Sequence, residues 1–150
     1  MRFFGLSIAT VLLLGSATTF ANIRVGTELS FDLKGDRSDP DRLSWSFTLE
    51  DQYYFSGNLV AYYADGTSSN RINAITKAQL KEWDTLVHNC QSSGGVEETI
   101  TVPAGTFKTC RMTSSENGFS RWFTDQVPAY IVRMKMPDGT YTLELSKFAW

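Results

Sequence analysis

Residues 96–122 read VEETITVPAGTFKTCRMTSSENGFSRW, and the turn VPAGTF at 102–107 lies near the middle of this stretch. Alternating polar and apolar residues precede and follow the proline and glycine of the turn, which is typical of a β-hairpin. The stretch therefore predicts two antiparallel strands, with Cys110 on the second and a third strand beginning near Gly118.

Two registers are compatible with this hairpin. A three-residue loop, Pro103 to Gly105, places Val102 opposite Thr106. A two-residue loop at 104–105 instead places Val102 opposite Phe107 and Glu98 opposite Arg111, which joins apolar side chains and pairs opposite charges. We favour the second register.

The sequence contains two cysteines, Cys90 and Cys110. They could act as a reactive thiol or a metal pair, but a zinc site needs about four ligands, and His88 is the one histidine. In an exported chain a disulfide is favoured. The preferred hairpin register puts Cys110 beside Thr99, on the face that would meet a helix ending near Cys90.

The first residues predict export. Arg2 precedes a short apolar run at 3–14, and Thr19-Phe20-Ala21 is an acceptable cleavage site. This pattern is typical of a secretory signal peptide at residues 1–21, with Ala17 as an alternative cleavage position. Cleavage near Ala21 leaves one β-rich domain at 22–150, which we expect to be soluble in the bacterial periplasm or secreted.

Hydrophobic alternation predicts strands in the N-terminal half of the chain. The segments are 22–35, 43–49 and 53–63, with a bulge or tight turn expected at Gly57-Asn58. In the second segment the inward residues are Leu43, Trp45, Phe47 and Leu49. The aromatic cluster of Tyr53, Tyr54, Phe55, Tyr62 and Tyr63 fits either a ligand site or ordinary cross-strand packing, and packing is favoured.

The loop GDRSDPD at 35–41 contains Asp36, Asp39 and Asp41. Three carboxylates invite calcium, but the loop lacks the glycine and final glutamate of a recognised calcium loop. We interpret it as a solvated turn and predict no metal site.

One helix is well signalled. Thr76 and Gln79 form a capping-box pattern, and Ile75 and Leu80 occupy the positions of a hydrophobic staple. Apolar residues then recur at helical spacing until about Asn89, which places Cys90 just after the helix. A Cys90–Cys110 disulfide would therefore attach the end of this helix to the central hairpin.

Two more strands are expected at 119–124 and 130–136, followed by a hairpin turn at Asp138-Gly139. A two-residue loop there gives a consistent register, with Arg133 and Lys135 on the polar face. The expected pairs are Met136 with Tyr141, Met134 with Leu143 and Val132 with Leu145.

Together these segments predict an α+β fold that is mainly β. We expect a curved antiparallel sheet of eight or nine strands, forming a half-barrel or open barrel, with one helix packed across it. Whether the barrel is open or filled stays undecided at this point.

The C-terminal half resembles a group of small exported bacterial proteins and lipoproteins of unknown function. The shared features are VPAGTF at 102–107, Cys110, Trp122, Val127-Pro128, Asp138-Gly139 and Glu144-Leu145. Several members of that group are similar to open β half-barrels of the lipoprotein-carrier type. The resemblance covers about 95–148, consists of turn and core residues, and implies a fold rather than a catalytic group.

Three classes of function are compatible with these patterns. A non-enzymatic binding module would hold an apolar ligand or lipidated partner in the half-barrel, and an envelope assembly factor would instead use an exposed sheet edge or aromatic patch. Catalysis is disfavoured, because His88 suits a helix end and Glu97 and Glu98 point to opposite faces of a strand. The formal net charge of −2 predicts no nucleic acid partner, and the absence of nucleotide or metal motifs predicts no cofactor. No apolar run after the signal segment approaches the length of about 20 residues that a membrane-spanning helix needs, so we expect no membrane span. The expected apolar lining is Trp45, Phe47, Tyr53, Phe55, Trp122, Val132, Met134 and Met136.

Overall fold

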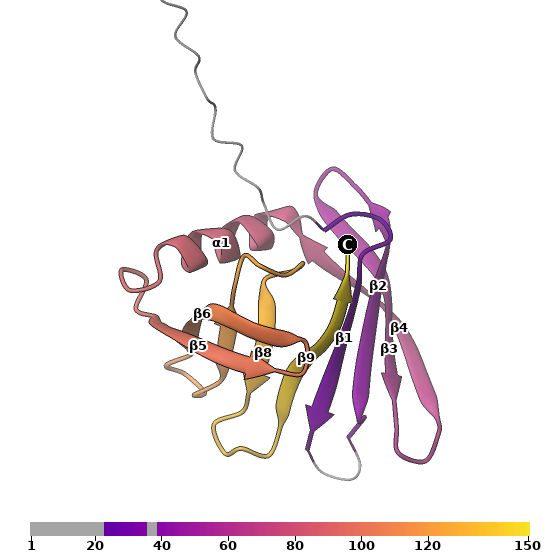
Figure 1. Ribbon diagram of the computed structural model, residues 1–150. Helices are drawn as coiled ribbons and strands as arrows, with labels where there is room; N and C mark the ends of the chain where they lie inside the picture. The colour runs from indigo at the N-terminus through magenta and orange to yellow at the C-terminus, as the bar shows by residue number, and fades with distance from the viewer. Residues whose placement is uncertain (1–22, 36–38) are drawn as a thin grey trace, which may run out of the picture.

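The computed structural model describes residues 23–35 and 39–150, so the predicted signal peptide lies outside the described residues. These residues form one sheet with the strand order β4-β3-β2-β1-β9-β8-β7-β6-β5, in which all neighbouring strands are antiparallel. The strands are β1 Glu28–Lys34, β2 Arg42–Glu50, β3 Tyr54–Tyr62, β4 Ser68–Thr76, β5 Val96–Val102, β6 Gly105–Thr113, β7 Ser120–Phe123, β8 Ile131–Lys135 and β9 Thr142–Ala149, and the helix α1 spans Lys77–His88. β4 and β5 are the two ends of the sheet, so it is open and curved (Figure 1), which confirms the predicted α+β class.

The first three strands form a meander whose side chains alternate between two faces. Leu29, Phe31 and Leu33 of β1 are buried, as their spacing predicts. In β2 the alternation breaks after Phe47, because the register with β3 shifts between Phe47 and Leu49. Leu49 consequently pairs with Ser56 and is 47% exposed, so the prediction that it faces inward is wrong.

The predicted interruption at Gly57 is also wrong in its position. β3 runs through Gly57 and Asn58 without a turn, and the irregularity lies on the neighbouring strand β2. Gly57 is opposite Phe47, at a point where the two backbones approach closely. A glycine inside a strand is typical of such a close approach.

β4 was not predicted as a strand. Its sequence SSNRINAIT is polar, and a helix signal begins directly after it. The strand nevertheless pairs with β3 along its whole length, from Ser68 opposite Tyr62 to Thr76 opposite Tyr54. An end strand bonds on one side only and one of its faces meets solvent, so it needs little hydrophobic patterning.

The central hairpin adopts a register that neither expectation gave. Its loop is Pro103–Ala104, so Val102 pairs with Gly105 and Ile100 with Phe107. This pairing is shifted by two residues from the favoured one, and since side chains repeat every two residues the shift keeps each residue on its predicted face. Cys110 therefore still lies opposite to the face of Phe107, although its neighbour on β5 is Glu97 rather than Thr99.

The second C-terminal hairpin has the predicted register. Met134 pairs with Leu143, and Arg133 pairs with Glu144. The paired strands end at Lys135 and Thr142, and the backbone N–H of Met136 still donates to the carbonyl of Tyr141 at 3.0 Å.

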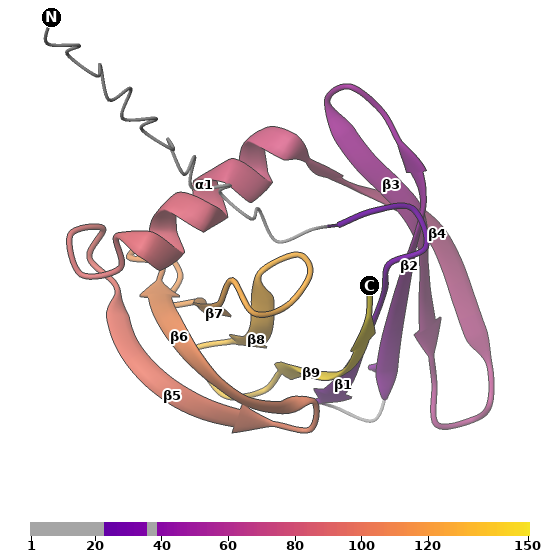
Figure 2. The ribbon, with the colours of Figure 1, turned by 45° about the horizontal axis from the view of Figure 1, so that its top comes forward.

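The helix begins with the predicted capping box. The Thr76 hydroxyl accepts a hydrogen bond from the Gln79 N–H at 3.0 Å, and the Gln79 side chain accepts one from the Thr76 N–H at 3.0 Å. The staple residues Ile75 and Leu80 are both buried. α1 lies across the opening between the β3–β4 side and the β5–β6 hairpin (Figure 2).

Replacing Thr76 with Ala is expected to lower the free energy of unfolding by about 1 kcal/mol, because the Gln79 N–H at the start of α1 loses its acceptor, the Thr76 hydroxyl. Thermal or urea denaturation followed by circular dichroism measures the change. Thr76→Ser keeps the hydroxyl and is the matched control, expected to stay close to the parent. Equal stability of the Ala and Ser variants would contradict a contribution from the cap.

The C-terminal end of α1 is held by the predicted disulfide. Cys90 and Cys110 are bonded, with their Cα atoms 5.6 Å apart, and both are 2% exposed. Deeper in the core, Tyr130 is fully buried and its hydroxyl donates to Asp84 Oδ1 of α1 at 2.9 Å. The helix is therefore attached to the sheet by one covalent and at least one polar contact.

Candidate functional site

The predicted apolar lining is not brought together as one open site. Phe47, Phe55, Trp122 and Val132 are buried in the core, while Trp45, Met134 and Met136 are partly buried. Tyr53 precedes β3 and is 68% exposed. Together with Leu80, Phe123, Val127 and Tyr130, the buried members belong to one packed cluster.

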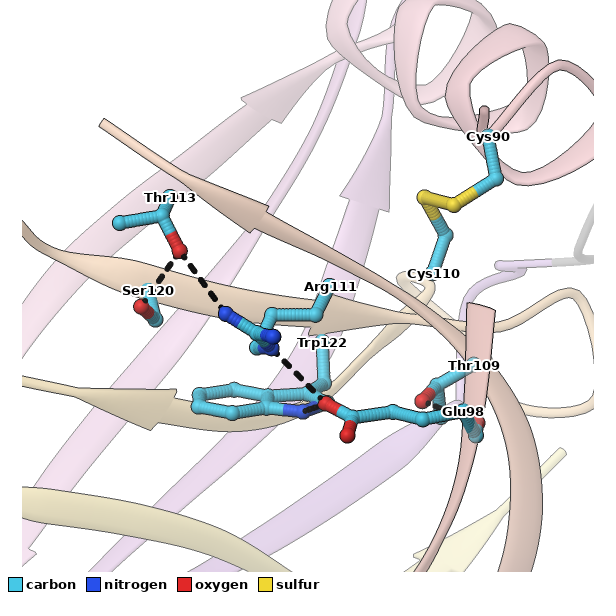
Figure 3. Close-up of polar contacts among 8 residues, drawn as sticks. All are labelled: Cys90, Glu98, Thr109, Cys110, Arg111, Thr113, Ser120 and Trp122. Atoms are coloured by element: carbon cyan, nitrogen blue, oxygen red, sulfur yellow. Dashed lines mark hydrogen bonds and ion pairs between the residues drawn. A yellow bond between two sulfur atoms is a disulfide. The ribbon is translucent and has the colours of Figure 1, made fainter. Parts of the chain in front are cut away.

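Trp122 belongs to a chain of polar contacts that crosses the C-terminal strands (Figure 3). Its indole N–H donates to Glu98 Oε1 at 2.6 Å, and Arg111 Nε donates to the same oxygen at 2.9 Å. The predicted Glu98–Arg111 pair therefore exists, as a diagonal contact rather than a directly opposed one.

The chain of contacts continues on the next strands. The guanidinium of Arg133 lies 5.5 Å from the Trp122 ring centroid, and Arg133 Nε donates to Glu144 Oε1 at 2.8 Å. Lys34 Nζ lies 3.3 Å from Glu144 Oε2. Each charge has an opposite neighbour, so the charges of this set are satisfied within it, and the contacts join six neighbouring strands, β5 to β9 and β1.

A second region has the properties expected of a binding site. A groove of about 430 Å³ lies on the N-terminal half of the sheet, and we call it the concave groove. This volume falls within the roughly 300–1,000 Å³ typical of small-molecule sites. Its lining is Leu33, Pro40, Leu43, Leu59, Ala61, Tyr63, Ser69, Asn70, Arg71 and Tyr141.

The register of β2, β3 and β4 produces the floor of the concave groove. Leu43 is opposite Ala61, and Ala61 is opposite Ser69. In the next row Trp45 is opposite Leu59, and Leu59 is opposite Arg71. Directly opposed residues share a face, so each row runs from apolar side chains on β2 and β3 to polar ones on β4.

The polar end of the concave groove is formed by β4 and the loop before β9. The Tyr63 hydroxyl lies 3.5 Å from the Ser69 hydroxyl oxygen. Burial and the nearby Asp39 carboxylate raise the pKa of Tyr141, while Arg71 acts in the opposite direction. The Tyr141 phenol therefore stays protonated near neutral pH, between an acidic and a basic neighbour.

Sequence reasoning placed Leu43 and Trp45 on the inward face of their strand but did not name Leu43, Leu59, Arg71 or Tyr141 as site residues. Arg71 escaped because β4 was not recognised as a strand. The cue that could have identified it is the hairpin turn at Asp65-Gly66, after which a returning strand is expected.

Trp45 lies beside the concave groove, and its indole N–H is not hydrogen-bonded to any described residue. The indole nitrogen is buried. The ring stacks on Phe47 at a centroid distance of 4.5 Å. A buried donor without an acceptor costs about 1–3 kcal/mol.

Trp45→Phe is therefore expected to leave the free energy of unfolding within about 1 kcal/mol of the parent, or to raise it, because the smaller ring removes the unpaired N–H. Urea denaturation measures this. Trp122→Phe is the matched comparison, and it is expected to be clearly destabilising because it removes the hydrogen bond from the indole N–H to Glu98 Oε1 and leaves Arg111 as the donor to that oxygen. Equal losses in the two variants would contradict the assignment of an unpaired donor at Trp45.

A more polar depression of about 480 Å³ lies where the end of α1 meets the hairpin and the β7–β8 loop. Charged side chains dominate its rim, among them Glu97, Lys108 and Asp125. It adjoins Cys110 of the disulfide, and its lining has few apolar groups. It fits an apolar ligand less well than the concave groove does.

His88, the imidazole considered for catalysis, has its contacts on its own helix. His88 Nδ1 lies 2.8 Å from the Asp84 carbonyl oxygen and 3.6 Å from Asp84 Oδ1, so the ring interacts with its own helix. Within residues 23–35 and 39–150 no three His, Cys, Asp or Glu side chains are grouped to hold a metal ion. Asp36 of the acidic loop lies outside the described residues.

Over residues 23–35 and 39–150, the fold and the groove define the class of this protein as an open, curved antiparallel sheet with one helix and an amphipathic groove on the N-terminal half of the sheet. Comparison with models of known protein families, with curated proteins and with solved structures finds no match to this chain. In the part of the chain that the structure describes, no helix has the length and apolar character needed to cross a membrane.

Proposed function

We propose that this chain is a non-enzymatic exported protein that binds an apolar ligand in the concave groove. The observation that carries the proposal is the groove itself, in which Leu33, Leu43 and Leu59 line a volume of about 430 Å³. Apolar walls with a few polar groups at one end are typical of small-molecule sites. The lining differs from the predicted set beneath the helix, where packed side chains occupy the space.

Two further observations support a binding rather than a catalytic role. The cysteines are joined in a disulfide, so neither offers a thiolate. His88 interacts with Asp84 of its own helix. The resemblance of residues 95–148 to exported half-barrel proteins agrees with the same proposal, as does a disulfide in a chain that begins with a signal-like segment.

Titration with the neutral apolar dye N-phenyl-1-naphthylamine tests binding. We expect saturable fluorescence enhancement in the parent and its loss in Ala61→Trp, because the added ring fills the groove. Val60→Trp places the same ring on the opposite face of β3 and is the matched control, expected to bind as the parent does. A parent without saturable binding, or an Ala61→Trp variant that binds normally, would overturn the proposal.

Export has its own test. The protein recovered from the extracytoplasmic fraction of an expressing bacterium is expected to begin at Asn22, as measured by intact-mass spectrometry. Protein confined to the cytoplasm with residues 1–21 retained would contradict this part of the proposal.

A second candidate function is pairing of another protein with the sheet edge at β4. It is favoured by Ile72, an apolar residue on this end strand that is 80% exposed. An exposed edge is a ready template for an added strand. A photo-crosslinking residue at position 72 is then expected to give a discrete adduct in cells. The same residue at the exposed position of Glu116 is the control and is expected to give no adduct. Absence of an adduct at position 72 would refute edge pairing.

A further inference from the structure

Among the residues that the structure describes, Arg71 of β4 differs from the other arginines of the sheet in having no side-chain partner. No hydrogen bond, ion pair or aromatic contact joins its side chain to another described residue, whereas four other strand arginines each have one. Arg42 lies over the Tyr62 ring, Arg121 over the Phe119 ring, Arg111 pairs with Glu98, and Arg133 pairs with Glu144.

The position of Arg71 brings its positive charge to the concave groove. It is directly opposite Leu59 on β3, and both residues line the concave groove. Among the described lining residues it is the one cation. A guanidinium offers a planar fork of donors that matches a carboxylate with two parallel hydrogen bonds.

The remaining polar groups restrict the charge of a ligand. Arg71 and Asp39 act in opposite directions on the pKa of Tyr141, so both lie within electrostatic reach of its phenol. The Asp39 carboxylate opposes any second negative charge brought into this end of the groove. The protonated phenol of Tyr141 can donate a further hydrogen bond to an acceptor there.

The volume of the concave groove limits the size of the apolar part of a ligand. About 430 Å³ is toward the lower end of the range for small-molecule sites, which suits one hydrocarbon chain rather than two. Leu33, Leu43 and Leu59 provide apolar contact on β1, β2 and β3, next to the polar side chains of β4.

We propose that the concave groove binds a single-chain amphiphile with a carboxylate head, whose chain lies along Leu43 and Leu59 and whose head pairs with Arg71. This proposal rests on the proposed function, since it names the ligand class of the same groove. It goes beyond that function by requiring a negative head and by assigning its recognition to one residue.

Isothermal titration calorimetry tests the proposal with three ligands that share a twelve-carbon chain, each kept below its solubility limit or micellar concentration. Dodecanoate has the carboxylate, dodecanol is neutral, and dodecyltrimethylammonium carries the opposite charge. Dodecanoate is expected to bind the parent at least about 10-fold more tightly than dodecanol, the effect of a charge-assisted hydrogen bond. Dodecyltrimethylammonium is expected to bind most weakly.

The variant Arg71→Gln is expected to remove the preference for dodecanoate while dodecanol binding stays within about 2-fold of the parent. Arg71→Lys keeps the charge without the fork and is expected to keep part of the preference. Arg42→Gln makes the same charge change on the opposite face of the sheet and is the matched control, with the full preference retained. Far-ultraviolet circular dichroism verifies that each variant is folded.

The outcomes separate the two proposals. Equal affinity for dodecanoate and dodecanol, or a preference that survives Arg71→Gln, overturns the assignment of Arg71 and leaves apolar binding intact. Failure of all three ligands to bind the folded parent overturns the proposed function together with this inference.

Discussion

Gly57→Ala is expected to lower the free energy of unfolding by about 3 kcal/mol or more, enough to leave a marginally stable domain largely unfolded. A Cβ at this position would overlap the backbone carbonyl oxygen of Ser46 and lie 2.8 Å from Phe47 Cα. Both obstacles are backbone atoms of β2, so no rotation of a side chain can relieve the overlap. The strands would have to separate where Phe47, 1% exposed, anchors the core.

Equilibrium urea denaturation followed by circular dichroism and tryptophan fluorescence measures the effect. Gly66→Ala is the matched control, because nothing lies within 4 Å of a Cβ there and its φ of +83° is the source of any cost. That left-handed position is expected to cost on the order of 1 kcal/mol. A Gly57→Ala variant as stable as Gly66→Ala would contradict the close approach of β2 and β3.

The helix and its cap could be predicted because their signals are local. Thr76 and Gln79 are three residues apart, and both hydrogen bonds of the capping box depend on that spacing alone. The β8–β9 register followed equally well from its two-residue turn and from the agreement of apolar and charged pairs.

The central hairpin shows where such reasoning stops. Pairing charges directly across the strands favoured Glu98 opposite Arg111, yet the structure makes the same ion pair diagonally and places Ile100 opposite Phe107. Glu98 also accepts from the indole of Trp122 on β7. This contact with a third strand could not be revealed by a comparison of two strands.

The candidate site escaped prediction for a related reason. The predicted lining came from the most apolar residues, and the most apolar residues of a small domain fill its core, as Val132 and Phe47 do. The concave groove instead joins moderately apolar positions to a polar end strand. Arg71 acquires its position only through pairing with Leu59, which is a tertiary relation between segments on opposite sides of a turn.

The double variant Cys90→Ala/Cys110→Ala is expected to lose about 3 kcal/mol of unfolding free energy, because the disulfide joins residues 20 apart and removes freedom from the unfolded chain. Loss of two buried sulfurs adds a packing cost of the same sign. The parent denatured in urea with a reductant is the matched comparison, since it loses the bond but keeps the sulfur atoms. A double variant as stable as the oxidised parent would show that the bond does not stabilise the fold.

Gly95 provides an internal check on this effect, because its backbone lies against the disulfide. A Cβ at Gly95 would come within 2.6 Å of Cys110 Sγ and 2.8 Å of Cys90 Sγ. Gly95→Ala is therefore expected to cost about 1–3 kcal/mol in the oxidised parent and clearly less in the double alanine background, where both sulfurs are absent. An equal cost in both backgrounds would refute packing against the bond.

Loss of the disulfide is expected to leave ligand binding in the concave groove unchanged. Without the bond, α1 still has the Tyr130–Asp84 hydrogen bond and the contact of Trp83 with Phe123, at a centroid distance of 5.7 Å. The concave groove is formed by β1–β4 and the loop before β9, and neither cysteine lines it. Dodecanoate affinity measured well below the unfolding transition should therefore stay within about 2-fold of the parent in the double alanine variant, and a larger loss would mean that the covalent attachment of α1 also shapes the groove.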